Sequence, residues 1–211
     1  MEIERLVISD YETNCYVVMR DKHTTDCLLI DTGLEAGPIL DYLAENKLHP
    51  VAVVLTHGHA DHIIGLGELR AKYSEIKVYI HKEDAGMLTN GKENLCELIG
   101  MEFETEAADV LLSDGDVVEE AGIRLQVLYT PGHTKGGICL YCENEGLVFT
   151  GDTLFANSIG RIDFPGGSYE QLLQSIKNKV LTLPDETVCL PGHGMRTTIG
   201  REKKSNPFLQ P

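Results

Sequence analysis

Short apolar segments that end in turns bearing histidine or aspartate constrain the fold of this chain more than any other feature. Residues 51–55 are entirely apolar, which predicts a strand buried on both faces, and they lead directly into Thr56-His57-Gly58-His59-Ala60-Asp61-His62. Three further predicted strands end in the same way, at Pro131-Gly132-His133, Gly151-Asp152 and Pro191-Gly192-His193. Strand ends hold side chains rigidly while the loops beyond them stay open, so we expect these residues to converge on one site.

Strands and helices follow one another along both halves of the chain. Alternating or wholly apolar runs predict strands over residues 2–8, 14–19, 27–30, 51–55, 77–80, 117–120, 124–129, 137–142, 147–150 and 187–190. Apolar residues at helical spacing predict helices over residues 38–47, 63–73, 82–88 and 169–181. Because helices trail each set of strands, we expect two sheets packed together with helices outside. No linker composition divides the chain, so residues 1–211 are expected to form a single domain.

Two stretches lack this regular pattern. Residues 90–113 are rich in glycine and glutamate with weak periodicity, and they interrupt the succession of strands. An insertion of this kind is typical of a lid or a binding loop. Residues 196–211 form a polar tail that closes the chain.

The charge and composition of the chain exclude several classes of protein. Of its 211 residues 42% are hydrophobic, which excludes a disordered or low-complexity chain. The formal net charge of −15 repels phosphate backbones and anionic lipid, so neither nucleic acid nor a membrane is an expected partner. No apolar run approaches the roughly 18 residues that span a bilayer, and the charged N-terminus is unlike a signal peptide, so we expect a cytoplasmic location.

The six cysteines are expected to be free and mostly buried, because a chain with this much core needs no disulfide. Cys139 and Cys142 have C-x-x-C spacing, but on a strand these two positions face opposite sides of the sheet. They are therefore not expected to share a metal ion or to form a disulfide.

Seven side chains at the strand ends are candidate metal ligands: His57, His59, Asp61, His62, His133, Asp152 and His193. Imidazole and carboxylate groups bind zinc, iron or manganese, and one tetrahedral ion takes only three of them with a water molecule. Seven ligands are too many for one ion and suit two, with Asp152 shared. Such a pair of ions makes hydroxide available at neutral pH, which predicts metal-assisted hydrolysis. The remaining histidines are expected to be ordinary surface or core residues: His23, His49 and His81.

These motifs resemble those of the metallo-β-lactamase superfamily, and within it the glyoxalase II-like hydrolases. The resemblance lies in His57-Gly58-His59-Ala60-Asp61-His62, Pro-Gly-His133-Thr, Thr-Gly-Asp152-Thr-Leu-Phe and Pro-Gly-His193-Gly, which occur in the family's order across most of the chain. The resemblance implies an α+β fold, a four-layer αββα sandwich of two mixed β-sheets with outer helices and a metal site at one edge.

The resemblance also implies a role for each candidate residue. The first metal ion would be held by His57, His59 and His133, the second by Asp61, His62 and His193, and Asp152 would bridge the two. Asp31, in Ile-Asp-Thr-Gly, is similar to the family's buried acid that orients the ligand loop, and an ordinary turn-forming aspartate is the alternative interpretation. Lys135 and Arg161 follow two of the ligand loops and are candidates to meet an anionic group of the substrate.

Differences among members of the superfamily narrow the expected activity. Zinc β-lactamases with a cysteine ligand have Cys at the position of Asp152, and flavodiiron proteins have Glu at the position of His59. The tRNA-processing nucleases are longer and dock an RNA, which the net charge of this chain disfavours. The segment Gly160-Arg161-Ile162-Asp163-Phe164 after the Asp152 motif is most similar to glyoxalase II-type thioesterases and persulfide dioxygenases. Full-length glyoxalase II has a C-terminal helical region that binds glutathione, whereas the short segment after His193 here suggests a smaller or different thiol carrier, or broader specificity.

We therefore expect a dinuclear metal-dependent hydrolase, a thioesterase that acts on S-acyl-glutathione-like or other small thioesters through a metal-bridging hydroxide. Asp61 would orient the nucleophile as well as bind metal, and zinc is the expected metal in both positions, with iron or manganese as alternatives. The expected partner is a small-molecule substrate, and the sequence does not specify an oligomeric state. Two alternatives stay open: a persulfide dioxygenase-like oxidoreductase with one iron on His57, His133 and Asp152, and a non-enzymatic metal-binding protein.

Overall fold

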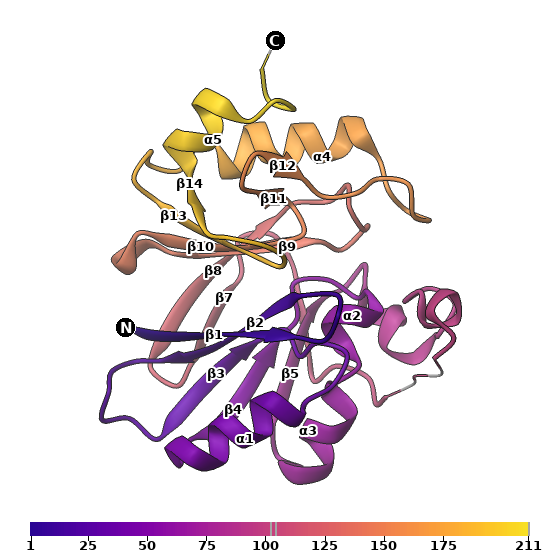
Figure 1. Ribbon diagram of the computed structural model, residues 1–211, viewed down its shortest axis with the longest axis vertical. Coiled ribbons are helices and arrows are strands. Elements are labelled where there is room, and N and C mark those ends of the chain that lie inside the picture. The colour runs from indigo at the N-terminus through magenta and orange to yellow at the C-terminus, as the bar shows by residue number, and fades with distance from the viewer. Residues whose placement is uncertain (102, 104, 211) are drawn as a thin grey trace.

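Two mixed sheets pack face to face at the centre of the molecule (Figure 1). The computed structural model describes residues 1–101, 103 and 105–210. The first sheet has the order β1 (Glu2–Ile8), β2 (Thr13–Met19), β3 (Asp26–Ile30), β4 (His49–Val54), β5 (Lys77–His81) and β6 (Val110–Leu112). Within it, β1, β2 and β3 run antiparallel to their neighbours in that order, whereas β3, β4, β5 and β6 run parallel.

The second sheet comes from the C-terminal half of the chain. Its order is β14 (Thr197–Thr198), β13 (Val188–Pro191), β10 (Leu147–Gly151), β9 (Ile138–Cys142), β8 (Ile123–Tyr129) and β7 (Val117–Glu120). Neighbouring strands are antiparallel except β10 and β13, which are parallel. Two short strands, β11 (Leu154–Phe155) and β12 (Ser158–Ile159), form a separate ribbon after β10.

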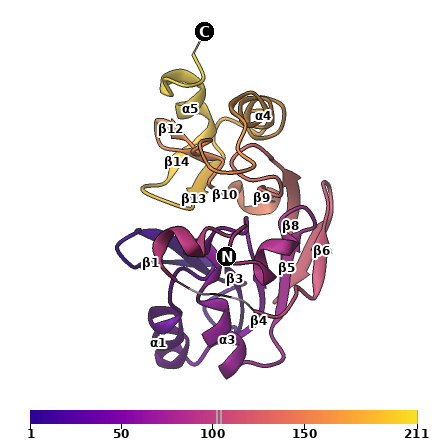
Figure 2. The same cartoon turned by 90° about the vertical axis from the view of Figure 1, so that its right-hand side faces the viewer.

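Helices cover the outer faces of both sheets. The first sheet carries α1 (Gly37–Asn46) and α3 (Leu66–Lys72), and the second carries α4 (Tyr169–Ser175), a π-helix that continues it (Ile176–Val180), and α5 (Ile199–Ser205). Figure 2 shows the same succession from the side, with α4 and α5 at one end and α1 and α3 at the other. The four-layer αββα sandwich implied by the resemblance is therefore confirmed.

Buried apolar side chains form three layers: one between the two sheets, and one between each sheet and its helices. The strand β4 contributes to two of them, because Ala52 and Val54 lie in the layer between the sheets while Val53 packs beneath α1 and α3. The prediction that this strand is buried on both faces is confirmed. Cys139 lies in the layer under α4 and Cys142 in the layer between the sheets, so the two thiols face opposite sides of β9 as expected. All six cysteines are free and buried.

Two predicted helices differ from the observed structure because their backbone hydrogen bonds depart from the α-helical pattern. The predicted helix over residues 63–73 is split into α2 (Ala60–Ile63) and α3, because the Gly65 N–H donates to the Gly33 carbonyl (2.9 Å) instead of continuing the helix. The predicted helix over residues 82–88 is only a 3₁₀-helix, Ala85–Thr89, in which the Met87 N–H donates to the Asp84 carbonyl (2.9 Å).

The two stretches that lacked a regular pattern do contain regular structure. Residues 90–113 include a 3₁₀-helix, Cys96–Ile99, and the strand β6, which is too short to show a period. The polar tail folds into β14 and α5. The helix α5 was missed because its buried face carries Glu202, whose carboxylate accepts hydrogen bonds from Thr197 Oγ1, the Asn157 N–H and Asn206 Nδ2. A charged residue on the buried face conceals the helical pattern of apolar residues.

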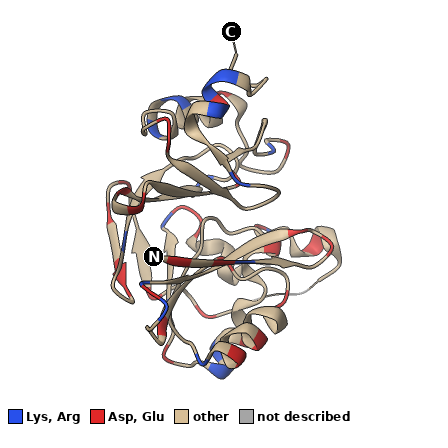
Figure 3. Cartoon of the chain, turned by 60° about the vertical axis from the view of Figure 1, so that its left-hand side comes forward, with Lys and Arg blue, Asp and Glu red and all other residues tan. Residues whose placement is uncertain are grey.

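Charged side chains are distributed unevenly over this fold. Figure 3 shows basic residues on α5 and acidic residues on β1, where Glu2 and Glu4 lie beside the N-terminus. Among the helices that the structure describes, none is long and apolar enough to cross a membrane. The expectation that nucleic acid is not a partner stays a prediction.

Candidate metal centre

The segment after β4 supplies four of the candidate ligands. His57 and His59 lie in the loop, and Asp61 and His62 lie in the first turn of α2. A side chain at Gly58 has no space, because its Cβ would lie 2.6 Å from the Cβ of Met87. The backbone between the two histidines is therefore packed directly against the 3₁₀-helix Ala85–Thr89.

Three loops of the second sheet supply the other candidates. His133 follows β8, Asp152 follows β10 and His193 follows β13. Gly192 lets the last loop approach, since a Cβ there would lie 2.3 Å from Asp152 Oδ1 and 2.8 Å from His62 Cε1. The same loop is tied to the first sheet, because the Asn14 N–H donates to the Gly192 carbonyl (2.7 Å).

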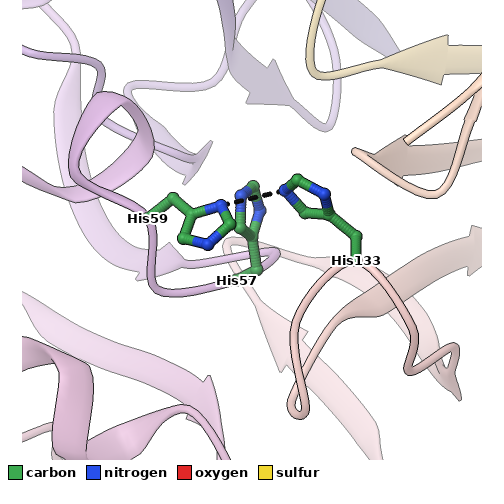
Figure 4. A group of neighbouring side chains, drawn as sticks. All are labelled: His57, His59 and His133. Atoms are coloured by element: carbon green, nitrogen blue, oxygen red, sulfur yellow. Dashed lines mark hydrogen bonds between the residues drawn. The ribbon is translucent and has the colours of Figure 1, made fainter. Parts of the chain in front are cut away.

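The first ligand group consists of His57, His59 and His133 (Figure 4). Their candidate ligand atoms lie within 4.8 Å of one another, and His59 Nδ1 and His133 Nε2 are 2.9 Å apart. The other ring nitrogen of His133 donates to the Arg161 carbonyl (2.8 Å), and His57 Nδ1 lies 3.1 Å from Thr56 Oγ1. These contacts leave Nε2 of His57 and Nε2 of His133 to face the group.

The second ligand group consists of Asp61, His62 and His193. His193 Nε2 lies 3.1 Å from Asp61 Oδ2 and 3.3 Å from His62 Nε2. The outer nitrogens are again occupied, His62 Nδ1 by Asp31 (2.8 Å) and His193 Nδ1 by the Tyr11 carbonyl (3.0 Å). Each ring is thereby oriented with its Nε2 toward the group.

Asp152 lies between the two ligand groups. Its Oδ1 is 3.5 Å from His62 Nε2, and its Oδ2 is 3.6 Å from both His133 Nε2 and His193 Nε2. The structure thus brings all seven predicted ligands together, with one carboxylate in reach of both groups.

The donor set fits bound divalent metal. Three buried atoms of the site have no hydrogen-bond partner among the described residues, which costs roughly 1–3 kcal/mol for each atom unless a ligand is bound: His57 Nε2, His59 Nε2 and Asp152 Oδ1. Burial and the neighbouring imidazoles hold the pKa of His57 and His59 well below the usual range, so both rings are neutral, the form that binds metal.

In the second ligand group the acids and the imidazoles shift one another's pKa values toward the charged forms. Burial would lower the pKa of His62, but the carboxylates of Asp61, Asp31 and Asp152 raise it to about 10. Burial would raise the pKa of Asp61, but His62 and His193 hold it well below its usual range. This concentration of negative charge around an imidazole favours a bound cation in the place of the proton.

Asp31 has the surroundings that the resemblance implies. It is buried at the end of β3 in a left-handed conformation (φ 59°), and its carboxylate accepts hydrogen bonds from the Thr56 N–H (2.7 Å), Thr56 Oγ1 (2.7 Å) and His62 Nδ1. This one side chain fixes both the start of the ligand loop and a ring of the second ligand group.

Asp84 has an equivalent position beside the first ligand group, and it was missed in the sequence. Its buried carboxylate accepts hydrogen bonds from the Gly58 N–H (3.1 Å), Thr134 Oγ1 (2.6 Å) and the Gly136 N–H (2.6 Å). Burial raises its pKa against these hydrogen bonds. The carboxylate joins the His57–His59 loop to the His133 loop, and no sequence motif distinguishes it from a surface acid.

A cavity of about 500 Å³ opens onto both ligand groups. Arg161 lines it, with its guanidinium 4.2 Å from the centre of the Phe164 ring and paired with Asp163 (2.7 Å). Lys135 is exposed and is not among the described residues that line the cavity. The described lining consists of Tyr11, His59, Ala60, Asp61, Leu95, Leu98, Ile99, His133, Asp152, Phe155, Arg161, Phe164 and His193.

The histidines outside the two ligand groups have ordinary surroundings. His81 stacks on Tyr129, with ring centres 4.3 Å apart, and His49 packs edge-on against Tyr73. Neither ring belongs to a set of possible ligands among the described residues.

Comparison with known families shows to which superfamily the chain belongs. Residues 9–193 match the family model described as the metallo-beta-lactamase superfamily. The chain belongs to the metallo-beta-lactamase superfamily. Within this superfamily it is 38% identical to "Probable metallo-hydrolase YqgX" of Bacillus subtilis (strain 168), over 99% of this chain and 98% of that protein. It is 34% identical to "Hydroxyacylglutathione hydrolase GloC" of Haemophilus influenzae, with 99% and 98% covered, which places it beside the glyoxalase II-like members.

Solved structures of the superfamily share the whole fold. The structure titled "BLEG-1 B3 metallo-beta-lactamase" superposes with a TM-score of 0.94, 36% identity and 100% of both chains covered. The structure of TTHA1623 "in a di-iron-bound form" superposes with a TM-score of 0.87 and 33% identity, over 98% of this chain and 100% of that one. The chain is therefore a member of a family of metal-dependent hydrolases, and its histidine and aspartate side chains form a site suited to divalent metal.

Proposed function

We propose that this protein is a dinuclear metal-dependent thioesterase that hydrolyses small thioesters. The observation that carries the proposal is the arrangement of seven ligands in two adjacent groups, with Asp152 within 3.6 Å of rings in both groups, at the floor of a cavity. A single mononuclear site would leave the second group of Asp61, His62 and His193 without a role.

Similar proteins support the same chemistry. One relative bears a name for thioester hydrolysis, hydroxyacylglutathione hydrolase, and the TTHA1623 structure is described as holding two irons. Zinc is the metal that we expect, with iron or manganese as alternatives, because imidazole and carboxylate accept all three. The net charge of −15 supports a small-molecule substrate rather than nucleic acid, and we propose a cytoplasmic location.

The residues of the site would divide the reaction between them. Two bound metal ions would polarise the thioester carbonyl and lower the pKa of a water molecule. Asp61 is 20% exposed toward the cavity, and its Oδ2 is held by His193 (3.1 Å) and Thr13 Oγ1 (3.3 Å), so it would orient the attacking water through its carboxylate. The thiol that leaves has a pKa of about 8.5, so the C–S bond can break without a dedicated acid.

Metal analysis combined with a substrate panel tests the proposal. The protein is loaded with zinc, iron or manganese, its metal content is measured, and hydrolysis of S-lactoylglutathione and S-acetyl-N-acetylcysteamine is followed. We expect two metal ions per chain and thioester hydrolysis that chelation abolishes. One iron per chain with sulfite formation from glutathione persulfide would replace the thioesterase with an oxidoreductase. Faster turnover of a cephalosporin than of any thioester would replace it with a β-lactamase.

A further inference from the structure

An apolar wall forms one part of the cavity above the metal centre. Leu98 and Ile99 belong to the 3₁₀-helix Cys96–Ile99, and Leu95 directly precedes it. Leu98 is 70% exposed, more than any other large hydrophobic residue among those described. Exposed apolar groups that line a cavity are typical of a surface that a ligand covers.

This wall is fixed relative to the second ligand group. The buried Asn94 donates from Nδ2 to the Met87 carbonyl (2.9 Å) and accepts the Cys96 N–H on Oδ1 (3.0 Å). Its carbonyl accepts the Ala60 N–H (2.8 Å) at the start of α2, one residue before Asp61. Leu95 then takes a left-handed conformation (φ 72°), a strained state for a leucine that the surrounding contacts must maintain.

The charges of the cavity do not match an anionic thiol carrier. Arg161 is the one lysine or arginine among the described lining residues, and its guanidinium is already engaged by Asp163 and by the face of Phe164. The acids of the lining, Asp61 and Asp152, are candidate metal ligands. A glutathione thioester carries two carboxylates and an ammonium group, so its carrier would leave charges unpaired against this surface.

We infer that the cavity selects thioesters with an uncharged apolar group, such as a linear acyl chain of several carbons, and that Leu98 determines this specificity. The inference rests on the proposed thioesterase function, and it identifies the substrate class of the same site. The apolar group packs on Leu95, Leu98 and Ile99, and the thioester carbonyl lies beside the candidate metal ligands that line the same cavity.

Two series of compounds with increasing chain length test the apolar specificity of the cavity separately from thioester hydrolysis. The first series consists of N-acetylcysteamine thioesters from acetyl to hexanoyl, and kcat/KM should rise about fourfold per added methylene while the wall is being covered. The second consists of the matching S-alkyl thioethers, which cannot be hydrolysed, and their dissociation constants measured by calorimetry should fall by the same factor. S-Lactoylglutathione should be a poorer substrate than the hexanoyl thioester.

Two leucine variants distinguish the wall from the rest of the surface. In L98Q each added methylene should change kcat/KM in the first series, and the dissociation constant in the second, by less than about twofold, because the amide presents a polar surface to the acyl or alkyl chain. The matched control is L111Q, since Leu111 is also exposed (56%) and lies in the same 90–113 segment but outside the cavity lining. L111Q should show the same change in kcat/KM and in dissociation constant per methylene as the wild type.

The outcomes are separable. A flat chain-length profile in the wild type, a preference for S-lactoylglutathione, or an L98Q protein with an unchanged gain would overturn the inference while thioester hydrolysis stands. If no thioester is hydrolysed but thioether binding still follows chain length and responds to L98Q, the proposed function fails and the apolar specificity of the cavity stands.

Discussion

The carboxylate of Asp84 gives a sharp test of how the first ligand group is built. In D84N one carboxylate oxygen becomes an NH₂ group. If that oxygen is Oδ1, the NH₂ faces the Gly136 N–H, and if it is Oδ2, the NH₂ faces the Gly58 N–H. Neither backbone donor can reverse its direction, so one buried N–H loses its acceptor in either orientation.

The structure sets the size of the expected effect. A buried N–H without an acceptor costs roughly 1–3 kcal/mol. Because the lost hydrogen bond joins the loop of His57 and His59 to the loop of His133, this cost applies to the conformation that binds metal. The affinity of the first ligand group for metal should therefore fall about 5- to 150-fold.

Zinc titration against a competing chelator measures this affinity, and the absorption spectrum of the cobalt-loaded protein reports the geometry of the group independently of activity. The matched control is D109N, because Asp109 also accepts a backbone N–H, that of Val78 (2.8 Å), together with Arg70 (3.2 Å), but joins neither ligand loop. Wild-type zinc affinity in D84N, or an equal loss in D109N, would refute this account of Asp84.

Three further predictions follow from the same contacts. His193→Ala should leave one metal ion per chain, whereas Asp152→Ala should weaken the binding of both ions, because the Asp152 carboxylate lies within 3.6 Å of rings in both ligand groups. Elemental analysis after dialysis measures this, and equal stoichiometry in the two variants would contradict the bridging position. Burial raises the pKa of the Cys139 thiol to about 11, so its reactive thiolate is scarce at pH 8 and increases only as the pH rises toward that value. A thiol reagent at pH 8 should therefore modify the native protein slowly and all six cysteines after unfolding in urea, and rapid modification of the native protein would show that the thiols are accessible. Glu202→Ala should lower the free energy of unfolding by roughly 1–3 kcal/mol, measured by urea denaturation, because Thr197 and the Asn157 N–H lose their acceptor; an unchanged midpoint would show that α5 docks without this carboxylate.

The candidate ligands could be read from the sequence because each one follows a strand that is itself evident. The run of residues 51–55 is apolar throughout, and its burial between two layers follows directly from that composition. Strand, turn and ligand are all local in the chain. The convergence of these turns was expected from the pattern of strand ends, whereas the assignment of His59 and His133, which lie 74 positions apart, to the same ligand group was implied by the resemblance.

Features that depend on distant backbone groups could not be read in this way. Asp84 looks like any acid in a polar turn, and its role comes from N–H groups at Gly58 and Gly136 that only the fold brings near. The helix α5 could not be predicted for the same reason. Its buried face carries the charged Glu202, and that burial is possible only because Thr197 and Asn157 donate hydrogen bonds to the carboxylate. Residues 90–113 were expected to form a lid or binding loop, and Leu95, Leu98 and Ile99 of this segment do line the cavity.

Each ligand group takes side chains from both halves of the sandwich, and this has a consequence for how the protein is made. On the ribosome the chain emerges from its N-terminus, so the ligands of the first group are all present once His133 has left the exit tunnel. The second group stays incomplete until His193 has been synthesised as well. Uptake of the second ion should therefore follow uptake of the first, and a nascent chain halted between these two histidines should retain at most one ion.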